Sequence, residues 1–268
     1  MAVIEFKDVS HVMPNGIMAL SNVNLKIERG EVLAIVGSNG AGKTTLLKHM
    51  NGLLKPSSGS VFVFGSETKG KSVAELSRHV GLVFQNSDHQ IFSESVFEEI
   101  AFGLRNFGFA GEELYNKIIS TLRWFDLYDL KDRPPMTLSG GEKKRLCIAT
   151  VIAWNPEVLV LDEPTVGQDY PNKVRLFALI KRLIGEGRTV VIVSHDLEFL
   201  WPLSPRTVVM ANGRILTEGS AESIFMDEEL LNSAGLRQPQ LAQLAMRLNL
   251  RSPFSSLDDA VTWFRGRI

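Results

Sequence analysis

The sequence predicts an α/β fold in which a mostly parallel sheet is covered by helices. Three short apolar runs, 32–36, 158–161 and 189–193, have the length and composition of strands buried on both faces. Segments with helical periodicity separate these runs, and strands that alternate with helices form parallel sheets. A glycine-rich stretch follows the first run and leads into a helical pattern over 43–50, as expected for one strand–turn–helix unit.

The N-terminal and central segments add two further parts to this fold. Residues 3–6 and 23–27 alternate apolar and polar side chains on either side of the turn Pro14-Asn15-Gly16, which favours an antiparallel β subdomain at the N-terminus. Residues 61–64 and 80–84 are further strand candidates. From about 95 to 153 the periodicity is helical and breaks at Pro134-Pro135, which indicates an inserted helical subdomain over about 86–155.

The C-terminal third returns to alternation and then ends in helices. A helix near 172–184 and a strand at 208–210 complete the α/β pattern. After Ser220 the pattern is helical again, with an apolar stripe of Leu241, Leu244, Ala245 and Leu248. We therefore predict a main domain over residues 1–225 and a short C-terminal helical extension over 226–268.

Composition excludes several classes of function. The 268 residues carry a net charge of −1, which argues against a nucleic-acid partner. Cys147 is the one cysteine, so the chain cannot form an internal disulfide, and a reducing compartment is expected. The N-terminus lacks the layout of a signal peptide, and the apolar runs fall short of the roughly 20 residues that cross a membrane. We expect a soluble protein that reaches a membrane only through a partner.

A phosphate-binding loop follows the strand predicted at 32–36. Gly37, Gly42, Lys43 and Thr44 have P-loop spacing, with glycines where a backbone must wrap around an anion. The helix beginning near Lys43 directs the positive end of its dipole at the phosphates. We expect Lys43 to reach the β- and γ-phosphates of a bound triphosphate and the Thr44 hydroxyl to ligate Mg²⁺, as in many ATPases or GTPases. The residues expected to hold the nucleotide here are Gly37, Ser38, Asn39, Gly40, Ala41, Gly42, Lys43, Thr44 and Thr45.

Two carboxylates, Asp162 and Glu163, follow the apolar run 158–161. Beside a P-loop, Asp162 is expected to hold Mg²⁺ through water, and Glu163 to orient or deprotonate the attacking water. The alternative is a pair of solvated acids where a strand leaves the sheet, and the P-loop makes that alternative the weaker one.

The stretch Leu138-Ser-Gly-Gly-Glu142 decides which P-loop proteins this chain is similar to. Ser139 and Glu142 have the spacing of a capping box that opens a helix, and Gly140-Gly141 leave the amides of that helix uncovered. The stretch resembles the signature motif of the ATP-binding-cassette (ABC) family. The resemblance covers about residues 3–225. It implies a P-loop NTPase core with an inserted helical signature subdomain, so that residues 1–225 form an ABC ATPase domain.

The resemblance also implies roles for individual residues. In the family the signature helix contacts the γ-phosphate held by the P-loop of another subunit, which implies a dimer and nucleotide contacts from Ser139 and Gly141. Gln85 resembles the glutamine that senses Mg²⁺ and water and couples to the transporter. Asp169 resembles the aspartate that communicates across the dimer, and His195 the switch histidine that contacts the γ-phosphate. The implied catalytic residues are Glu163, His195, Gln85 and Lys43, and the implied Mg²⁺ ligands are Thr44, Gln85 and Asp162.

Two further features resemble the ATPases of energy-coupling-factor importers, including the cobalt and nickel type. One is Asp88 and Gln90 followed by Ala101-Phe-Gly103, and the other is Ala234-Gly-Leu before Pro239. The resemblance implies an ATPase on the cytoplasmic face of the cell membrane that pairs with a second copy or a related ATPase. Integral-membrane coupling and substrate-binding subunits would then import metal ions or vitamins. Candidates to line the groove for a membrane partner are Ile91, Phe92, Val96 and Phe97.

The sequence departs from the family pattern near Pro14. The family usually places an aromatic residue there to stack on adenine, whereas this chain has Met13, with His11 nearby. We expect adenine to rest on the Met13 thioether or on the His11 ring. Gln168 also replaces the leucine that is common before the loop aspartate. The rival function is a soluble ABC ATPase of DNA repair or translation. Such proteins carry coiled-coil insertions or two cassettes, and this sequence shows neither.

Overall fold

The computed structural model describes residues 1–250, 254 and 256–266 and contains two β-sheets. The larger sheet has six strands in the order β10-β9-β3-β8-β7-β6. Its neighbours are parallel except for the β9–β10 hairpin. The bounds are β3 (Val32–Val36), β6 (Val80–Val83), β7 (Val158–Asp162), β8 (Thr189–Val193), β9 (Arg206–Ala211) and β10 (Arg214–Ser220).

The smaller sheet is antiparallel and is built by the N-terminal segment. Its strand order is β2-β1-β4-β5. The bounds are β1 (Ala2–Val12), β2 (Met18–Glu28), β4 (Ser58–Val63) and β5 (Ser66–Glu67). The predicted α/β fold, with its antiparallel N-terminal part, is therefore confirmed.

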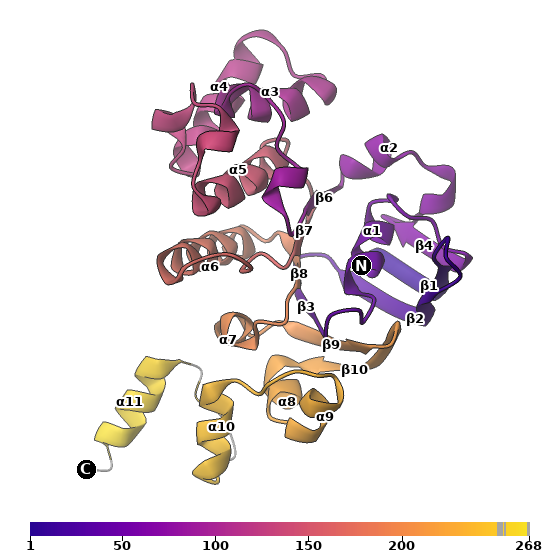
Figure 1. Cartoon of the computed structure of the whole chain (residues 1–268), viewed down its shortest axis with the longest axis vertical. Helices are drawn as coiled ribbons and strands as arrows, with labels where there is room; N and C mark the ends of the chain where they lie inside the picture. The colour runs from indigo at the N-terminus through magenta and orange to yellow at the C-terminus, as the bar shows by residue number, and fades with distance from the viewer. Residues whose placement is uncertain (251–253, 255, 267–268) are drawn as a thin grey trace.

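Helices surround the larger sheet and extend beyond both of its ends. Helices α3 to α5 gather at one end of the long axis and α8 to α11 at the other, with α6 and α7 between them (Figure 1). The α-helices are α1 (Lys43–Met50), α2 (Val73–Ser77), α3 (Val96–Asn106), α4 (Gly111–Trp124), α5 (Gly140–Ile152), α6 (Tyr170–Gly185), α7 (Leu197–Leu200), α8 (Ala221–Phe225), α9 (Glu228–Ser233), α10 (Gln240–Arg247) and α11 (Leu257–Arg265). Short 3₁₀ turns occur at Thr68–Gly70, Ser87–His89, Tyr128–Leu130, Pro135–Thr137 and Trp201–Leu203.

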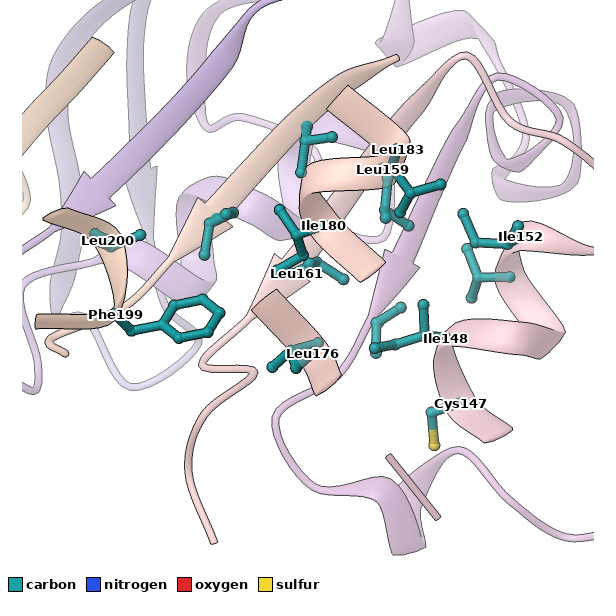
Figure 2. Packing of buried hydrophobic residues seen from close by; sticks show 14 of the residues in the cluster. Cys147, Ile148, Ile152, Leu159, Leu161, Leu176, Ile180, Leu183, Phe199 and Leu200 are labelled. Atoms are coloured by element: carbon teal, nitrogen blue, oxygen red, sulfur yellow. The ribbon is translucent and has the colours of Figure 1, made fainter. Parts of the chain in front are cut away.

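The two faces of the larger sheet bury two separate apolar clusters. Along β7, Val158 and Val160 point to the cluster shared with the N-terminal sheet and α1. Leu159 and Leu161 point to the other cluster, where they meet Ile180 of α6 (Figure 2). This division follows from the period of two along a strand. The second cluster also contains Phe225 and Leu231, so α8 and α9 share the core of the preceding residues.

None of the described helices combines the length and the apolar character needed to span a membrane.

Close packing around the P-loop explains one of its glycines. A Cβ on Gly42, which has φ +99°, would lie 2.6 Å from the backbone oxygen of Ala19 on β2. The turn residue Gly213, between β9 and β10, lies on another side of the same Cβ position at 3.3 Å. The start of α1 is therefore closely packed against β2 and the turn between β9 and β10, and only glycine fits there.

We predict that Gly42→Ala destabilises the protein more than Gly40→Ala. Gly40 has φ +83° and no atom within 4 Å of a Cβ, so both variants carry a similar backbone strain and only Gly42→Ala adds a clash. Overpacking of this kind costs about 1–3 kcal/mol. Urea unfolding of the two variants measures the difference, and equal free energies of unfolding would contradict the packing described here.

We also predict that Cys147 is unreactive in the folded protein. The side chain is fully buried on α5, and burial raises the pKa of its thiol to about 11. At about pH 8 roughly one molecule in a thousand would carry the thiolate. Alkylation by iodoacetamide should therefore be slow in buffer, accelerate as the pH rises towards 11, and become rapid in concentrated guanidinium. Equal rates in the two solvents would contradict this burial.

Candidate nucleotide site

The P-loop connects β3 to α1 and lines a pocket of about 250 Å³. Gly37, Gly40 and Gly42 all have positive φ, a conformation that side chains other than glycine rarely adopt. The lining also includes Gln85 from the end of β6 and Glu163 from the end of β7. Parallel strands end at the same edge of a sheet, and ligands of open α/β sheets bind at that edge.

Lys43 is buried, and its amine is held by oxygens on two sides. Nζ donates hydrogen bonds to Gly37 O at 2.7 Å and to Ser38 O at 3.0 Å. It also lies 3.8 Å from Glu163 Oε1. Burial lowers the pKa of Lys43, and the carboxylates of Glu163 and Asp162 oppose that shift. The charge of Lys43 is therefore poorly solvated, and an anionic ligand would stabilise it.

Asp162 and Glu163 both face the P-loop because the backbone turns between them. Asp162 is the last residue of β7, whereas Glu163 has φ +45°, outside strand geometry. The Thr44 hydroxyl donates to Asp162 Oδ2 at 3.0 Å. Burial raises the pKa of Asp162, and this hydrogen bond works against the shift. The left-handed conformation of Glu163 thus places its carboxylate in the pocket, while the adjacent Asp162 carboxylate accepts from Thr44, which lines that pocket.

His195 lies beside Glu163 at the end of β8. Its Nδ1 is 2.9 Å from Glu163 Oε2, and its backbone N–H donates to the same oxygen at 3.3 Å. Glu163 itself is only 5 % exposed, whereas the His195 side chain is 51 % exposed. The imidazole therefore orients a buried carboxylate and also reaches solvent, where a phosphate could meet it.

The donor set around Asp162 suits Mg²⁺. Asp162 Oδ1 and Glu163 Oε1 are buried and accept no hydrogen bond, and buried oxygens normally have a partner. The Thr44 hydroxyl lies beside Asp162. Mg²⁺ prefers such oxygens, usually one or two carboxylates completed by water and phosphate. Among the described residues no group of three or more His, Cys, Asp or Glu side chains could hold a metal without such outside ligands.

The loop after β6 carries Gln85 and is tied to the signature helix α5. The side chain of Lys144, a buried residue of α5, donates to Phe84 O and to Gln85 O, the latter at 2.8 Å. Gln90 accepts from Phe84 N–H and donates to Cys147 O at 3.0 Å. Asp88 forms an ion pair with Lys143 at 2.8 Å.

These contacts give Asp88 and Gln90 a physical role, and they add Lys144, which sequence reasoning missed. The signal for Lys144 was its place on the buried stripe of α5, three residues before Cys147 and four before Ile148.

The signature residues begin α5 as the capping-box pattern predicts. Ser139 Oγ accepts from Glu142 N–H, and Glu142 Oε2 accepts from Ser139 N–H at 2.8 Å. Ser139 is exposed, and Gly141 is buried against the side chain of Asn172 on α6. Neither Ser139 nor Gly141 belongs to the lining of the P-loop pocket of this chain. Asp169, which is exposed, caps α6 by accepting from Asn172 N–H at 3.0 Å.

The expected adenine contacts lie outside the pocket. Met13 is not among its lining residues. His11 is 8 % exposed, and its ring faces inward, where Nδ1 meets Lys55 O and the ring packs edge-on against His49. Because β1 points this side chain into the protein, the expectation that the His11 ring carries adenine is wrong. Ile17 and Met18 line the pocket instead and are both more than half exposed.

Comparison of sequences identifies relatives with the same motifs. The profile described as ABC transporter matches residues 20–166. The energy-coupling factor transporter ATP-binding protein EcfA of Methanothermobacter thermautotrophicus is 41% identical over 249 residues, which are 92% of this chain and 80% of that protein. An ABC transporter ATP-binding protein of Caldanaerobacter subterraneus is 40% identical over 260 residues, and there the chain spans 45% of the relative's length.

Solved structures share the fold. The structure of cbiO1 from Clostridium perfringens, part of the ABC transporter complex cbiONQ, matches with a TM-score of 0.77 and 34% identity over 91% of this chain and 99% of that one. The ATP-binding cassette MJ0796, solved as a dimer in a post-hydrolysis state bound to ADP and Pi, matches with a TM-score of 0.73 and 29% identity over 81% of this chain and 98% of its own. Motifs, geometry and relatives agree, and the chain belongs to the ABC transporter family as an ATP-binding cassette ATPase.

Proposed function

We propose that this chain is the ATP-hydrolysing subunit of an energy-coupling-factor importer and that Glu163 activates the attacking water. The observation that carries the assignment of ATP hydrolysis is the buried Glu163 carboxylate, held between Lys43 and His195 and facing the P-loop. Glu163 Oε2 is engaged by His195, whereas Oε1 lies 3.8 Å from Lys43 Nζ, accepts no hydrogen bond and is the oxygen proposed to take a proton from water.

The other pocket residues position the triphosphate. Lys43 exchanges its carbonyl partners for the β- and γ-phosphates, and the backbone amides of 39–45 surround them. The exposed edge of His195 contacts the γ-phosphate, while Gln85 orients the water from the end of β6. Ile17 and Met18 at the pocket mouth supply the apolar surface for adenine in place of the expected Met13.

Mg²⁺ is proposed to be held by the Thr44 hydroxyl and by Asp162 through water, with Gln85 close by. When bound, the ion neutralises charge that develops on the β- and γ-phosphate oxygens. The contribution of the chain is to keep Asp162 ionised and oriented, through the hydrogen bond from Thr44.

A second cassette completes the site. Ser139 and Gly141 sit at the N-terminus of α5, where helix amides attract an anion, yet they do not line the pocket of their own chain. MJ0796, a dimer bound to ADP and Pi, supports a partner cassette. The signature helix of that partner is proposed to cover the nucleotide. We propose that two cassettes, either two copies of this chain or this chain and a related ATPase, close on two ATP molecules, and that Asp169 lies at their interface.

A groove beside the helical subdomain is proposed to receive the membrane partner. It has a volume of about 590 Å³ and runs between α2, α3 and the loop after β6. Its exposed apolar side chains are Leu53, Val73, Phe92 and Phe102. Phe92 and Phe102 meet edge to face with 4.8 Å between ring centroids, and Glu99 fixes Phe92 by accepting its backbone N–H.

Four residues were expected to line this groove, and of these Phe92 does so. Ile91, in the loop before α3, is buried in the core. Val96 is also buried and Phe97 packs against the core, because the first turn of α3 directs these two side chains inward. The groove also includes Phe84 and Gln90, which neighbour Gln85. A partner helix seated there would press on the loop that carries Gln85, and this is how we propose that hydrolysis is coupled to transport.

The relatives named EcfA and the cbiO1 structure support an importer subunit at the cytoplasmic face of the cell membrane. We place the choice of cargo, either a metal ion such as cobalt or nickel or a vitamin, in the integral-membrane subunits.

Glu163→Gln should retain ATP binding and lose turnover. The amide keeps the shape of the side chain but cannot take a proton, so hydrolysis should fall by about 10²–10⁴-fold. Size-exclusion chromatography with ATP should then show a stable dimer. Glu112→Gln, an exposed change on α4, is the control and should hydrolyse ATP like the wild type. Unchanged turnover in Glu163→Gln would remove this residue from its role.

Replacing Phe92 and Phe102 together with serine should release the chain from its membrane partner. The apolar contact area of the groove is lost, while the P-loop pocket is untouched. In the native host, the amount of tagged chain that sediments with washed membranes should fall about tenfold, with ATP affinity retained. Leu216→Ser, an exposed apolar change on β10, serves as the matched control. Equal sedimentation of the two variants would reject the groove as the docking site.

A further inference from the structure

The P-loop is braced by a turn almost two hundred residues further along the chain. The backbone N–H of Ser38 donates to Ala234 O at 3.1 Å. Most P-loop amides are free to face a phosphate, but the amide of Ser38 is engaged by this carbonyl. The carbonyl therefore fixes one peptide of the P-loop, in addition to the hydrogen bond that Ala41 N–H donates to Ser38 O at 3.2 Å within the loop.

The turn that supplies this carbonyl is anchored in the core. Ala234 caps α9 and is 1 % exposed, and the following Gly235 has φ +68°. Leu236 N–H returns to Leu231 O at 2.9 Å, which gives the turn the hydrogen bond of a Schellman motif. Leu231 and Leu236 both belong to the core cluster that contains Phe225. The position of Ala234 O is thus set by the packing of α8 and α9 and not by the P-loop.

Ser38 also connects this turn to the catalytic groups. Its N–H is held by Ala234 O, and its own carbonyl accepts from Lys43 Nζ at 3.0 Å. Lys43 Nζ in turn lies 3.8 Å from Glu163 Oε1. The Gly37–Ser38 peptide unit has its N–H held by Ala234 O and its carbonyl, Gly37 O, accepting from Lys43 Nζ at 2.7 Å. It therefore links the turn after α9 to the ammonium group that the triphosphate must meet.

We propose that the Ala234–Gly235 turn is a positioning element for ATP binding, because it fixes the Ser38 peptide and through it Lys43. This rests on the proposed function, in which the P-loop of this chain binds ATP. The C-terminal segment then regulates nucleotide affinity: a shift of α8 or α9 moves Ala234 O, changes the Ser38 peptide and alters how readily Lys43 engages phosphate.

The tight approach of Gly235 to Ser38 offers a direct test. A Cβ on Gly235 would lie 3.1 Å from Ser38 Cβ, closer than ordinary contact. Gly187 provides a matched control, since it has φ +76° and no atom within 4 Å of a Cβ. Gly235→Ala and Gly187→Ala therefore carry a similar backbone strain, and only the first presses on the P-loop.

The dissociation constant of a fluorescent ATP analogue should rise about fivefold in Gly235→Ala and stay at the wild-type value in Gly187→Ala. The KM for ATP should rise by the same factor while kcat changes less than about twofold, because the reacting groups are unchanged. Both variants should lose thermal stability through backbone strain, and Gly235→Ala somewhat more because of its added contact with Ser38. Gly235→Asn, whose side chain tolerates positive φ better, should also weaken binding and covers the case in which Gly235→Ala does not fold.

A second substitution, Ser38→Gly, distinguishes a positioning role of the turn from a general loss of structure in Gly235→Ala. In a Ser38→Gly background the Cβ that Gly235→Ala would press on is absent, so adding Gly235→Ala should leave the dissociation constant of that background unchanged. Equal affinities of Gly235→Ala and Gly187→Ala, or a failure of Ser38→Gly to remove the effect, would overturn the proposal. The wild type in the same assay tests the proposed function separately. If the wild type failed to bind the analogue, both the proposed function and the positioning role would be rejected. Normal binding by the wild type with no effect of the variants would reject only the positioning role.

Discussion

The nucleotide site depends on burying two carboxylates and one ammonium at the carboxyl ends of β3 and β7. Burial raises the pKa of Asp162 and lowers that of Lys43, so none of these charges is well solvated. One cation cannot satisfy two carboxylates, and one oxygen of each accepts no hydrogen bond. Such a site is electrostatically incomplete, and in the proposed function a triphosphate with its metal ion completes it. The glycines of the P-loop and the left-handed Glu163 serve this arrangement, because they bring the backbone and the Glu163 carboxylate into one small pocket beside Asp162.

The same pocket is mechanically linked to surfaces that face away from it. Lys144 and Gln90 fasten the loop of Gln85 to the signature helix, so this loop and α5 form one hydrogen-bonded unit. The apolar groove shares Phe84 and Gln90 with that unit, and Ala234 reaches the P-loop from the C-terminal helices. Backbone carbonyl groups thus make several of the contacts between the pocket and these surfaces. In a closely packed interior, a shift of one element is passed to its neighbours.

Sequence patterns predicted the parts of the fold that are governed by continuous burial. The bounds of β3, α1 and β8 coincide with the apolar and periodic segments read from the chain. The pattern understated β1 and β2, since Asp8 and Asn22 adopt positive φ and register shifts interrupt the alternation. It gave no indication of β10, an edge strand with no buried residue. The direction of the His11 side chain, the role of Lys144 and the contact from Ala234 depend on tertiary packing that local periodicity does not encode.

The central claim is that each ATP site is built from two chains, with the P-loop from one and the signature helix from the other. Mixing Lys43→Ala protein with Ser139→Arg protein tests it most directly, because each variant alone lacks an intact site while a mixed dimer contains one. The account predicts negligible ATP hydrolysis by either variant and about a quarter of wild-type activity after free mixing in equal amounts, if the two sites act independently. Mixtures no more active than the separate variants would contradict a site shared between two copies of this chain.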